Sequence, residues 1–281
     1  MSQFLRDIAA PSVQEFTYEL DAPAVVTLFM PITLVEPDAL VEPDASASSV
    51  AMTEEEIFEK EFEAIKYSFG KIDLNSELDP EEYQGPTQES NWVIKGKLLV
   101  GAFPGYPDDI ENYSTLKSIL NLGVDTFVCL QKEYNDDTPE IVWKRTGMRP
   151  YYRDVLKIIQ NKEKYPDITT TVTHVDFIHE KIADCKTIDD EPTLKLAKKI
   201  VKLIHEGKKI YLHCWGGHGR TGVIVSLILH LMFRLKADES MYMCKKFHST
   251  RIAKVHVGSP QTQGQRDQVT QIIKKLETST L

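Results

Sequence analysis

The stretch HCWGGHGRTG, residues 213–222, decides the fold of this 281-residue chain. It follows KIYL (209–212), a short apolar run of the kind that forms a buried strand, and it leads into the apolar run VIVSLILHLMF (223–233). The order of strand, glycine-rich loop and helix is typical of α/β proteins, which bind ligands at the carboxyl ends of their parallel strands. We therefore expect Cys214 at the carboxyl edge of a sheet, directly before a buried helix.

The residues of this loop suit the binding and transfer of a phosphoryl group. Glycines allow turns that aim successive backbone N–H groups at one point, and the following helix presents its positive N-terminal end there. These groups stabilise a thiolate on Cys214, the form that attacks phosphorus. The planar guanidinium of Arg220 can hold two phosphate oxygens, and Thr221 can donate its hydroxyl to the sulfur. The alternative, a buried structural cysteine beside a glycine turn, does not explain such electropositive surroundings.

The pattern His-Cys-x5-Arg-Thr-Gly resembles the signature of the protein-tyrosine and dual-specificity phosphatase superfamily. Its Cys-Trp-Gly-Gly segment is similar to that of small bacterial and protist members. The resemblance implies that Cys214 is the nucleophile, that His213 organises the loop, and that neither a metal nor an organic cofactor is needed. The predicted phosphate-binding loop consists of Trp215, Gly216, Gly217, His218, Gly219 and Arg220.

Phosphoryl transfer to sulfur also needs an acid for the leaving oxygen, and in this superfamily an aspartate upstream of the cysteine serves. Asp184 lies 30 residues before Cys214, just after a predicted strand. Its surroundings, Lys-Ile-Ala-Asp-Cys, depart from the Trp-Pro-Asp of the tyrosine-specific enzymes, so other aspartates are candidates. We favour Asp184, because Asp176 falls within a predicted strand and Asp189 and Asp190 suit helix caps.

The segment VGSPQTQGQR (257–266) resembles the superfamily loop whose glutamine positions the attacking water. Both Gln261 and Gln265 are candidates for that role. The alternative is an ordinary helix start, because Ser259 and Pro260 precede apolar residues at helical spacing. That alternative explains the helix but not the glutamines.

From Trp92 onward, strand and helix patterns alternate, which predicts an α/β domain over residues 91–281. Strands are expected at 97–103, 126–130, 175–182 and 209–214, and helices after Asp109, from Asp190 to Gly207, and from Arg220. Together with the resemblance, this order implies a three-layer αβα phosphatase fold with a central, mostly parallel sheet.

Residues 1–90 differ from the rest and are predicted to be an N-terminal extension. They contain a short apolar stretch (24–34), a tandem LVEPDA repeat (34–45) whose prolines favour a linker, and a SASS segment. In TEEEIFEKEFEAI (53–65), the apolar spacing and the Thr53 cap signal predict an amphipathic helix. We expect this helix to dock on the catalytic domain, with binding to a partner as the alternative.

The formal net charge of −9 argues against a nucleic-acid or anionic-membrane surface, because such partners need clustered cations. A negatively charged substrate must therefore be held by local groups. No apolar run reaches the roughly 20 residues that a membrane span needs. The N-terminus lacks the pattern of a signal peptide, and the 4 cysteines lack the close pairing of a zinc site. These features predict a reducing, cytoplasmic setting.

Three features near the motif carry weaker expectations. His218 occupies a variable loop position, where a cation would suit a multiply phosphorylated substrate. Cys185, beside the proposed acid, could form a disulfide with oxidised Cys214, although a spectator thiol is the simpler interpretation. The basic run at 251–256 either rims the pocket or forms a solvated face through Arg251, Lys254 and His256.

Together these features predict a phosphomonoester hydrolase that acts through a cysteinyl-phosphate intermediate. Its expected substrate is phosphotyrosine in proteins, or, with dual specificity, phosphoserine and phosphothreonine as well. One alternative is a phosphoinositide or inositol-phosphate phosphatase. Another is a phosphoprotein-binding module that keeps the cradle without turnover, although Cys214, Arg220 and a suitable aspartate are all present.

Overall fold

The computed structural model describes residues 52–279, in which five strands form one sheet in the order β1-β2-β5-β3-β4. The edge strand β1 runs antiparallel to β2, and the pairs β2–β5, β5–β3 and β3–β4 are parallel. The sheet is therefore mostly parallel, as the sequence predicted. The strands are β1 Ser90–Ile94, β2 Leu98–Gly101, β3 Thr126–Gln131, β4 Asp176–Ile182 and β5 Ile210–His213.

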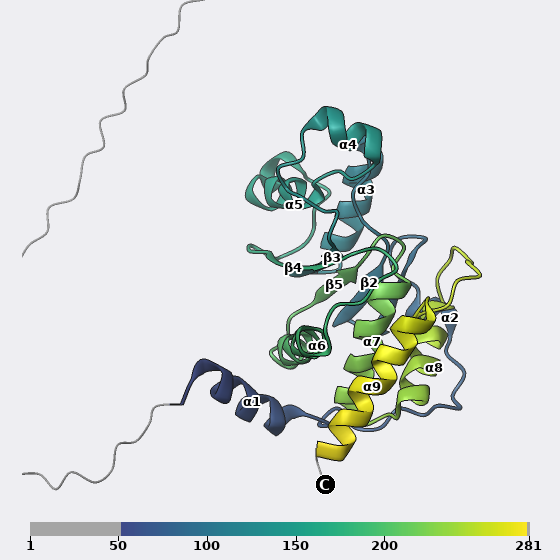
Figure 1. Cartoon of the computed structure of the whole chain (residues 1–281). Coiled ribbons are helices and arrows are strands. Elements are labelled where there is room, and N and C mark those ends of the chain that lie inside the picture. The colour runs from purple at the N-terminus through teal and green to yellow at the C-terminus, as the bar shows by residue number, and fades with distance from the viewer. Residues whose placement is uncertain (1–51, 280–281) are drawn as a thin grey trace, which may run out of the picture. The chain divides into compact units, whose positions relative to one another are not determined.

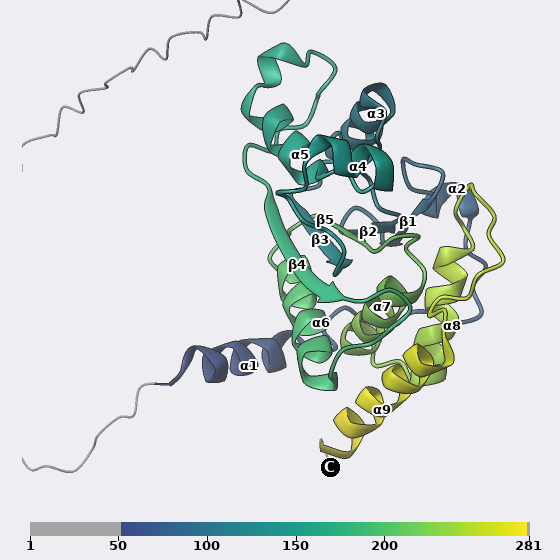
Figure 2. The same ribbon diagram turned by 45° about the horizontal axis from the view of Figure 1, so that its top comes forward.

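Helices cover both faces of this sheet (Figures 1 and 2). α6, α7, α8 and α9 lie on one face, and α3, α4 and α5 lie on the other, which gives the three-layer α/β fold that was expected. The helices are α1 Glu54–Ile65, α2 Pro80–Tyr83, α3 Asp109–Leu120, α4 Glu140–Thr146, α5 Tyr151–Gln160, α6 Asp190–His205, α7 Gly219–Phe233, α8 Ala237–His248 and α9 Gln263–Ser279, with a short 3-10 helix at Lys162–Lys164.

Alternation along the central strands divides the core into two layers. Successive side chains of a strand point to opposite faces, so in β2 Leu98 and Val100 join the cluster that includes α6 and α7, while Leu99 joins the cluster that includes α3 and α5. β5 follows the same rule, with Leu212 on the first side and Tyr211 on the second. The strands β2 and β5 are therefore buried on both faces, in keeping with their mostly apolar sequences, whereas the edge strand β4 (DFIHEKI) is only partly buried and carries charged residues.

The helix α7 is the central element of the fold. Every residue from Gly219 to Met232 is buried, because β5 and the helices α6, α8 and α9 surround it. A helix that is apolar all round belongs in the interior of a protein, and no helix within residues 52–279 is long and apolar enough to cross a membrane. The loop between β5 and α7 is thus anchored at both ends in the core.

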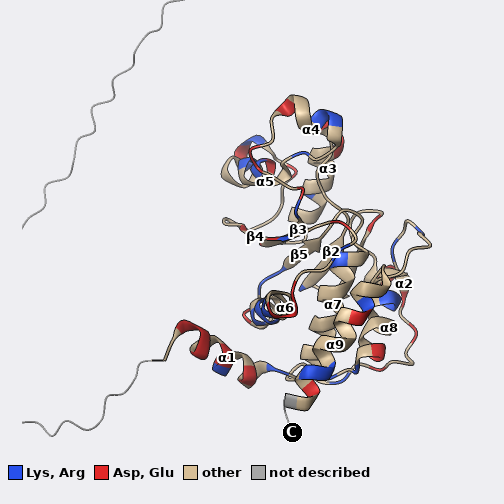
Figure 3. Cartoon of the chain, in the orientation of Figure 1, with Lys and Arg blue, Asp and Glu red and all other residues tan. Residues whose placement is uncertain are grey.

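The acidic helix α1 forms as predicted and lies against α6. Thr53 caps it with a full capping box, Phe62 is completely buried in the main core, and Glu55 pairs with Lys195 at 2.8 Å. Two further pairs join Glu59 to Lys198 and Glu61 to Lys202, in keeping with the acidic residues that dominate α1 in Figure 3. Exposed ion pairs contribute little, about 0–1 kcal/mol each, so burial of Phe62 is the main attachment.

The remaining predictions for the N-terminal extension fall largely outside the described residues. The apolar stretch, the LVEPDA repeat and the SASS segment all precede residue 52. Residues 52–90 pack with the remainder of the described chain as one compact unit. The domain limit at residue 90 stays a prediction.

One helix boundary differs from the sequence expectation. The pair Ser259-Pro260 does not open the last helix, because α9 begins at Gln263. The Ser259 hydroxyl instead donates to the carbonyl of His218 at 2.9 Å, and Pro260 lies so close to Gly222 that a Cβ at that glycine would come within 2.9 Å of the proline backbone. This segment therefore supports the loop before α7.

Candidate active site

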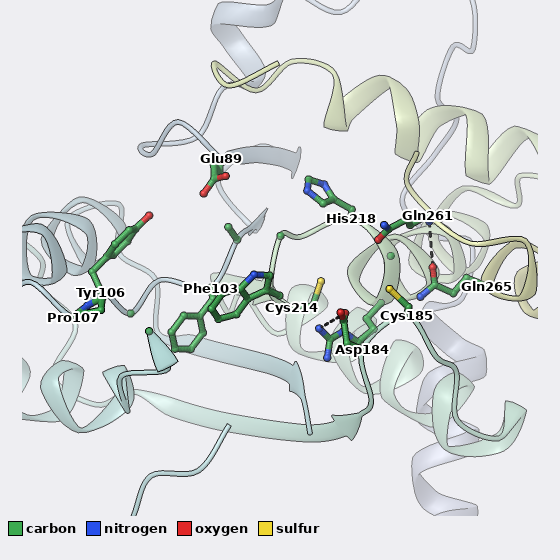
Figure 4. A pocket seen from close by; sticks show the side chains of 17 residues that line it. Glu89, Phe103, Tyr106, Pro107, Asp184, Cys185, Cys214, His218, Gln261 and Gln265 are labelled. Carbon is green, nitrogen blue, oxygen red and sulfur yellow. Dashed lines mark hydrogen bonds and ion pairs between the residues drawn. The ribbon is translucent and has the colours of Figure 1, made fainter. Parts of the chain in front are cut away.

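The carboxyl ends of parallel strands lead to one pocket, as the α/β rule predicts. β2 leads to Phe103, β4 to Asp184 and β5 to Cys214, which line the pocket, and β3 leads to Glu133, which contacts Arg220. The pocket measures about 560 Å³ (Figure 4). It is lined by Glu89, Ala102, Phe103, Gly105, Tyr106, Pro107, Gly147, Asp184, Cys185, Cys214, Trp215, Gly216, His218, Gly219, Arg220, Gln261 and Gln265.

The loop at the base of the pocket has free backbone donors. The N–H groups of residues 215–218 donate no hydrogen bond within the described part of the chain. Gly217 has a φ of 69°, and a Cβ there would lie 2.3 Å from the carbonyl oxygen of Gly101, so only glycine fits. Four free N–H groups in succession beside Cys214, at the base of the pocket, form a cradle for an anion.

A second arginine, Arg251, stabilises this loop from the protein interior. Arg251 is 1% exposed, and its guanidinium donates to the carbonyls of Gly216 (2.9 Å) and Gly217 (3.0 Å) and to Asn91 Oδ1 (2.8 Å). The C=O and N–H of a trans peptide point in opposite directions. The N–H groups of Gly217 and His218 are therefore directed away from Arg251.

Both expectations for the basic run at 251–256 are wrong for Arg251. Its side chain neither rims the pocket nor faces solvent, because it is buried behind the loop, whereas Lys254 and His256 are exposed. The sequence identifies Arg251 as part of a basic run, but it does not indicate that the loop carbonyls accept its hydrogen bonds.

The predicted organising role of His213 agrees with its contacts. The residue is fully buried, and burial lowers its pKa to about 3, so its ring is neutral. Since the carbonyl of Cys214 can only accept, Nδ1–H donates to it at 3.2 Å, and Nε2 then accepts from the Tyr151 hydroxyl at 2.6 Å. These two contacts fix the His213 ring against the backbone of Cys214.

Arg220 lies at the N-terminus of α7 with its guanidinium 2% exposed to solvent. Nη2 donates to Asp184 Oδ1 at 2.8 Å, and Nη1 donates to Glu133 Oε2 at 3.1 Å and to the carbonyl of Ile182 at 2.9 Å. The structure therefore brings the predicted acid and the predicted phosphate clamp into direct contact. Anchored by Glu133 and Ile182, the guanidinium can exchange its bond to Asp184 for phosphate oxygens.

Glu133 is a site residue that sequence reasoning missed. It follows β3 as Asp184 follows β4, so its place just after an apolar strand was the available signal. Nothing near it matches a motif of the superfamily, and Glu133 is not among the residues that line the pocket. It contacts the site through Arg220.

The two predicted glutamines occupy different environments. Gln265 is buried, and its Oε1 accepts from the backbone N–H groups of Gln261 (3.2 Å) and Thr262 (3.0 Å), so it shapes the loop. Gln261 is exposed, lines the pocket, and its side-chain amide makes no hydrogen bond within the described residues. Of the two, Gln261 has the free amide that positioning a water requires.

Thr221 and His218 depart from what was expected. The hydroxyl of Thr221 is buried without a hydrogen-bond partner among residues 52–279, so the predicted bond to the Cys214 sulfur is not formed in this structure. His218 Nδ1 lies 2.7 Å from His248 Nε2, and burial lowers the pKa of His218 to about 4. A neutral His218 does not supply the cation that a multiply phosphorylated substrate would need.

Cys185 lies in the same pocket as Cys214 and has a left-handed backbone, with φ 57°. Its thiol is exposed, whereas Cys214 is 3% exposed, and both are free. The disulfide between them stays a prediction. Within residues 52–279, no cluster of three or more His, Cys, Asp or Glu side chains could hold a metal ion.

Two viral proteins are similar to parts of this chain. "Putative tyrosine phosphatase 197R" of Invertebrate iridescent virus 6 is 33% identical over 142 residues, which cover 50% of this chain and 42% of the viral protein. "Putative tyrosine phosphatase 067L" of Invertebrate iridescent virus 3 is 42% identical over 45 residues, 16% of this chain and 19% of the viral protein. The chain thus spans less than half the length of these curated relatives.

Solved structures with a similar fold include Tk-PTP in its active form, with 19% identity and a TM-score of 0.43 over 65% of this chain and 95% of that one. A leucine rich repeat and phosphatase domain containing protein from Entamoeba histolytica has 13% identity and a TM-score of 0.43 over 70% and 98%. The family model described as "Swiss Army Knife protein, DSP-PTPase phosphatase domain" matches residues 87–271, which include the cradle, Asp184 and both glutamines. This chain belongs to that family of DSP-PTPase phosphatase domains.

Proposed function

We propose that this chain is a phosphomonoester hydrolase that removes phosphate from phosphotyrosine in proteins through a cysteinyl-phosphate intermediate. The observation that carries the proposal is a buried cysteine at the base of a pocket, next to four unbonded N–H groups and an arginine. Preorganised donors of this kind stabilise the charge of a transferring phosphoryl group. They also stabilise the thiolate that attacks it.

In the first step, the Cys214 sulfur attacks phosphorus and the bond from phosphorus to the leaving oxygen breaks. The phosphate dianion takes donors of Arg220 that Asp184 now occupies at 2.8 Å. Once released, Asp184 in its acid form gives its proton to the leaving oxygen. The products are the free hydroxyl compound and a phosphoryl group on sulfur.

In the second step, water attacks the phosphocysteine. The free amide of Gln261 positions this water, and the Asp184 carboxylate accepts its proton, which restores the acid for the next cycle. The bond between sulfur and phosphorus breaks, and the unpartnered hydroxyl of Thr221 can donate to the departing thiolate. Phosphate then leaves and Cys214 is regenerated.

The charge of the pocket favours phosphotyrosine over an inositol polyphosphate. Arg220 is the cationic side chain among the lining residues, and one phosphate engages it. The neutral pair of His218 and His248 removes the one observation that had favoured an inositide substrate. Dual specificity toward shorter phosphorylated side chains remains part of the same proposal.

The test is phosphate release from para-nitrophenyl phosphate and from phosphotyrosyl peptides by the full chain with chelator present. We expect turnover that resists the chelator and that Cys214→Ser abolishes while the thermal stability is retained. Turnover that survives Cys214→Ser would contradict the nucleophile. A folded parent chain that binds phosphopeptide without releasing phosphate would instead identify a binding module.

A further inference from the structure

The pocket extends well beyond the cradle. Its volume of about 560 Å³ lies in the range of pockets that hold a drug-sized ligand, more than one phosphate requires. Figure 4 shows two sides around Cys214: Asp184, Gln261 and Gln265 lie on one, and Phe103, Tyr106 and Glu89 lie on the other. The first side carries the hydrolytic groups, so the second side faces the rest of the substrate.

The second side carries an unpaired negative charge. Glu89 is exposed, and within the described residues its carboxylate forms no ion pair and accepts no hydrogen bond. Its backbone is fixed, because its carbonyl accepts from the N–H of Ala102 at 3.3 Å. Tyr106 lines the same pocket as Glu89. Burial raises the pKa of Tyr106, and the charge of Glu89 adds to the rise.

An aromatic surface lines the same pocket as this carboxylate. Trp215 is 48% exposed and stacks on Phe103, with ring centroids 5.7 Å apart and planes 18° from parallel. The N–H of Phe103 donates to the carbonyl of Trp215 at 2.8 Å, which fixes the backbone of this aromatic pair. An exposed indole and a carboxylate that line one pocket suit a Lys or Arg side chain, because both the ring face and the anion attract a cation.

The charges of the lining residues exclude a second phosphate as the occupant. Arg220 is the one cationic side chain among the lining residues, and the transferred phosphate engages it. Lowered pKa values keep His218 and His248 neutral, and Arg251 is buried behind the loop. A second phosphate beside Glu89 would meet like charge, and the lining residues offer it no cationic side chain besides Arg220.

We propose that Glu89, with the exposed face of Trp215, forms a specificity subsite that binds a basic side chain next to the phosphorylated residue. The inference rests on the proposed function and names its substrate class: monophosphorylated peptides with Lys or Arg close to the phosphotyrosine. Asp184 and Gln261 act on the phosphate, while Glu89 selects the sequence around it.

The test measures binding, so that it does not depend on turnover. Fluorescence anisotropy gives the affinity of the full chain carrying Cys214→Ser for phosphotyrosyl peptides that differ only in Lys or Glu beside the phosphotyrosine. We expect the Lys peptide to bind about two- to fivefold tighter, as an exposed ion pair allows. Adding Glu89→Gln should remove this preference, and adding Glu89→Lys should reverse it.

A matched control is Glu77→Gln, which removes an exposed carboxylate that does not line the pocket; it should leave the preference intact. Equal affinities, a preference that survives Glu89→Gln, no binding of either peptide, or tighter binding of an inositol polyphosphate would each overturn the subsite. Turnover of para-nitrophenyl phosphate by the parent chain tests the proposed function separately, because that substrate has no flanking residue.

Discussion

Two buried arginines stand on opposite sides of the same loop. Arg220 and Arg251 are both at most 2% exposed, yet their partners differ in kind. Arg220 contacts two carboxylates, Asp184 and Glu133, which belong to neighbouring strand ends. Within residues 52–279, Arg251 contacts no carboxylate; its guanidinium donates to two carbonyls of the loop and to the side chain of Asn91.

The difference in partners distinguishes an arginine that can bind substrate from an arginine that stabilises the loop. A guanidinium paired with an exposed carboxylate can exchange that partner for a phosphate, and Asp184 is 63% exposed. A guanidinium bound to backbone carbonyls deep in the protein has nothing to exchange with, so it fixes the peptide planes and adds positive charge behind the cradle. Changes on the Arg220 side should therefore alter catalysis, and changes on the Arg251 side should alter stability first.

The largest effect is expected for Asp184→Asn. Loss of the proton donor should lower kcat by about 10²–10⁴-fold for phenyl phosphate, whose leaving group needs an acid. The loss should be smaller for para-nitrophenyl phosphate, whose leaving group departs without help. Steady-state rates with both substrates check this, and an equal loss for the two would assign the acid elsewhere.

Arg220→Lys comes next. Lysine keeps the charge but cannot hold two phosphate oxygens with a planar fork, so kcat/KM should fall about 10²–10³-fold, as for loss of a donor to a developing oxyanion. Kinetics on para-nitrophenyl phosphate, with thermal unfolding as the check on folding, make the measurement. An active Arg220→Lys enzyme would mean that the cradle N–H groups alone suffice.

Arg251→Met tests the structural role assigned to Arg251. It leaves three buried oxygen acceptors without their donor, which should lower the free energy of unfolding by about 2–5 kcal/mol. Urea denaturation measures the change, and Arg145→Met, which alters an exposed arginine without ion pairs, is the matched control. If Arg251→Met kept full stability but lost activity, the contrast between the two arginines would be wrong.

The smallest effect concerns His248, which contacts His218 and whose pKa burial lowers to about 3. The unfolded chain takes up this proton near its ordinary pKa of about 6.5, while the folded chain does not. Stability should therefore fall as pH falls from about 6.5 toward 3, with a slope of about 1.4 kcal/mol per pH unit for each such proton.

His248→Gln should reduce this slope by up to about 1.4 kcal/mol per pH unit, the contribution of one proton. Urea denaturation at several pH values measures the slope. His213, neutral for the same reason, still contributes in the variant. Identical slopes for the parent and the variant would show that His248 is protonated in the folded state.

The sequence predicted the parts of the molecule that local pattern determines. β5, α7 and the loop between them follow from one continuous run of residues, because a buried strand, glycines and a buried helix each leave a clear pattern. The choice of Asp184 also rested on a position just after a strand, and the structure places it beside Arg220. Its catalytic role stays a prediction.

The remainder depends on contacts between segments far apart in the chain. Arg251 and Asn91 are separated by 160 residues, and Glu133 and Arg220 by 87, so no local pattern reveals these pairs. The neutral state of His218 likewise depends on burial against His248, which a sequence does not show. Short or weakly patterned elements, such as α4 and β1, were missed for a similar reason.

The central claim is that Cys214 carries the phosphoryl group during turnover. The most direct measurement is mass spectrometry of peptides from Gln261→Ala enzyme quenched in acid during steady-state turnover, since this variant should hydrolyse the intermediate slowly. The account predicts one added phosphoryl group on the peptide that contains Cys214, absent from a matched sample with Cys214→Ser. A turning-over enzyme without phosphate on Cys214, or with phosphate on another residue, would contradict it.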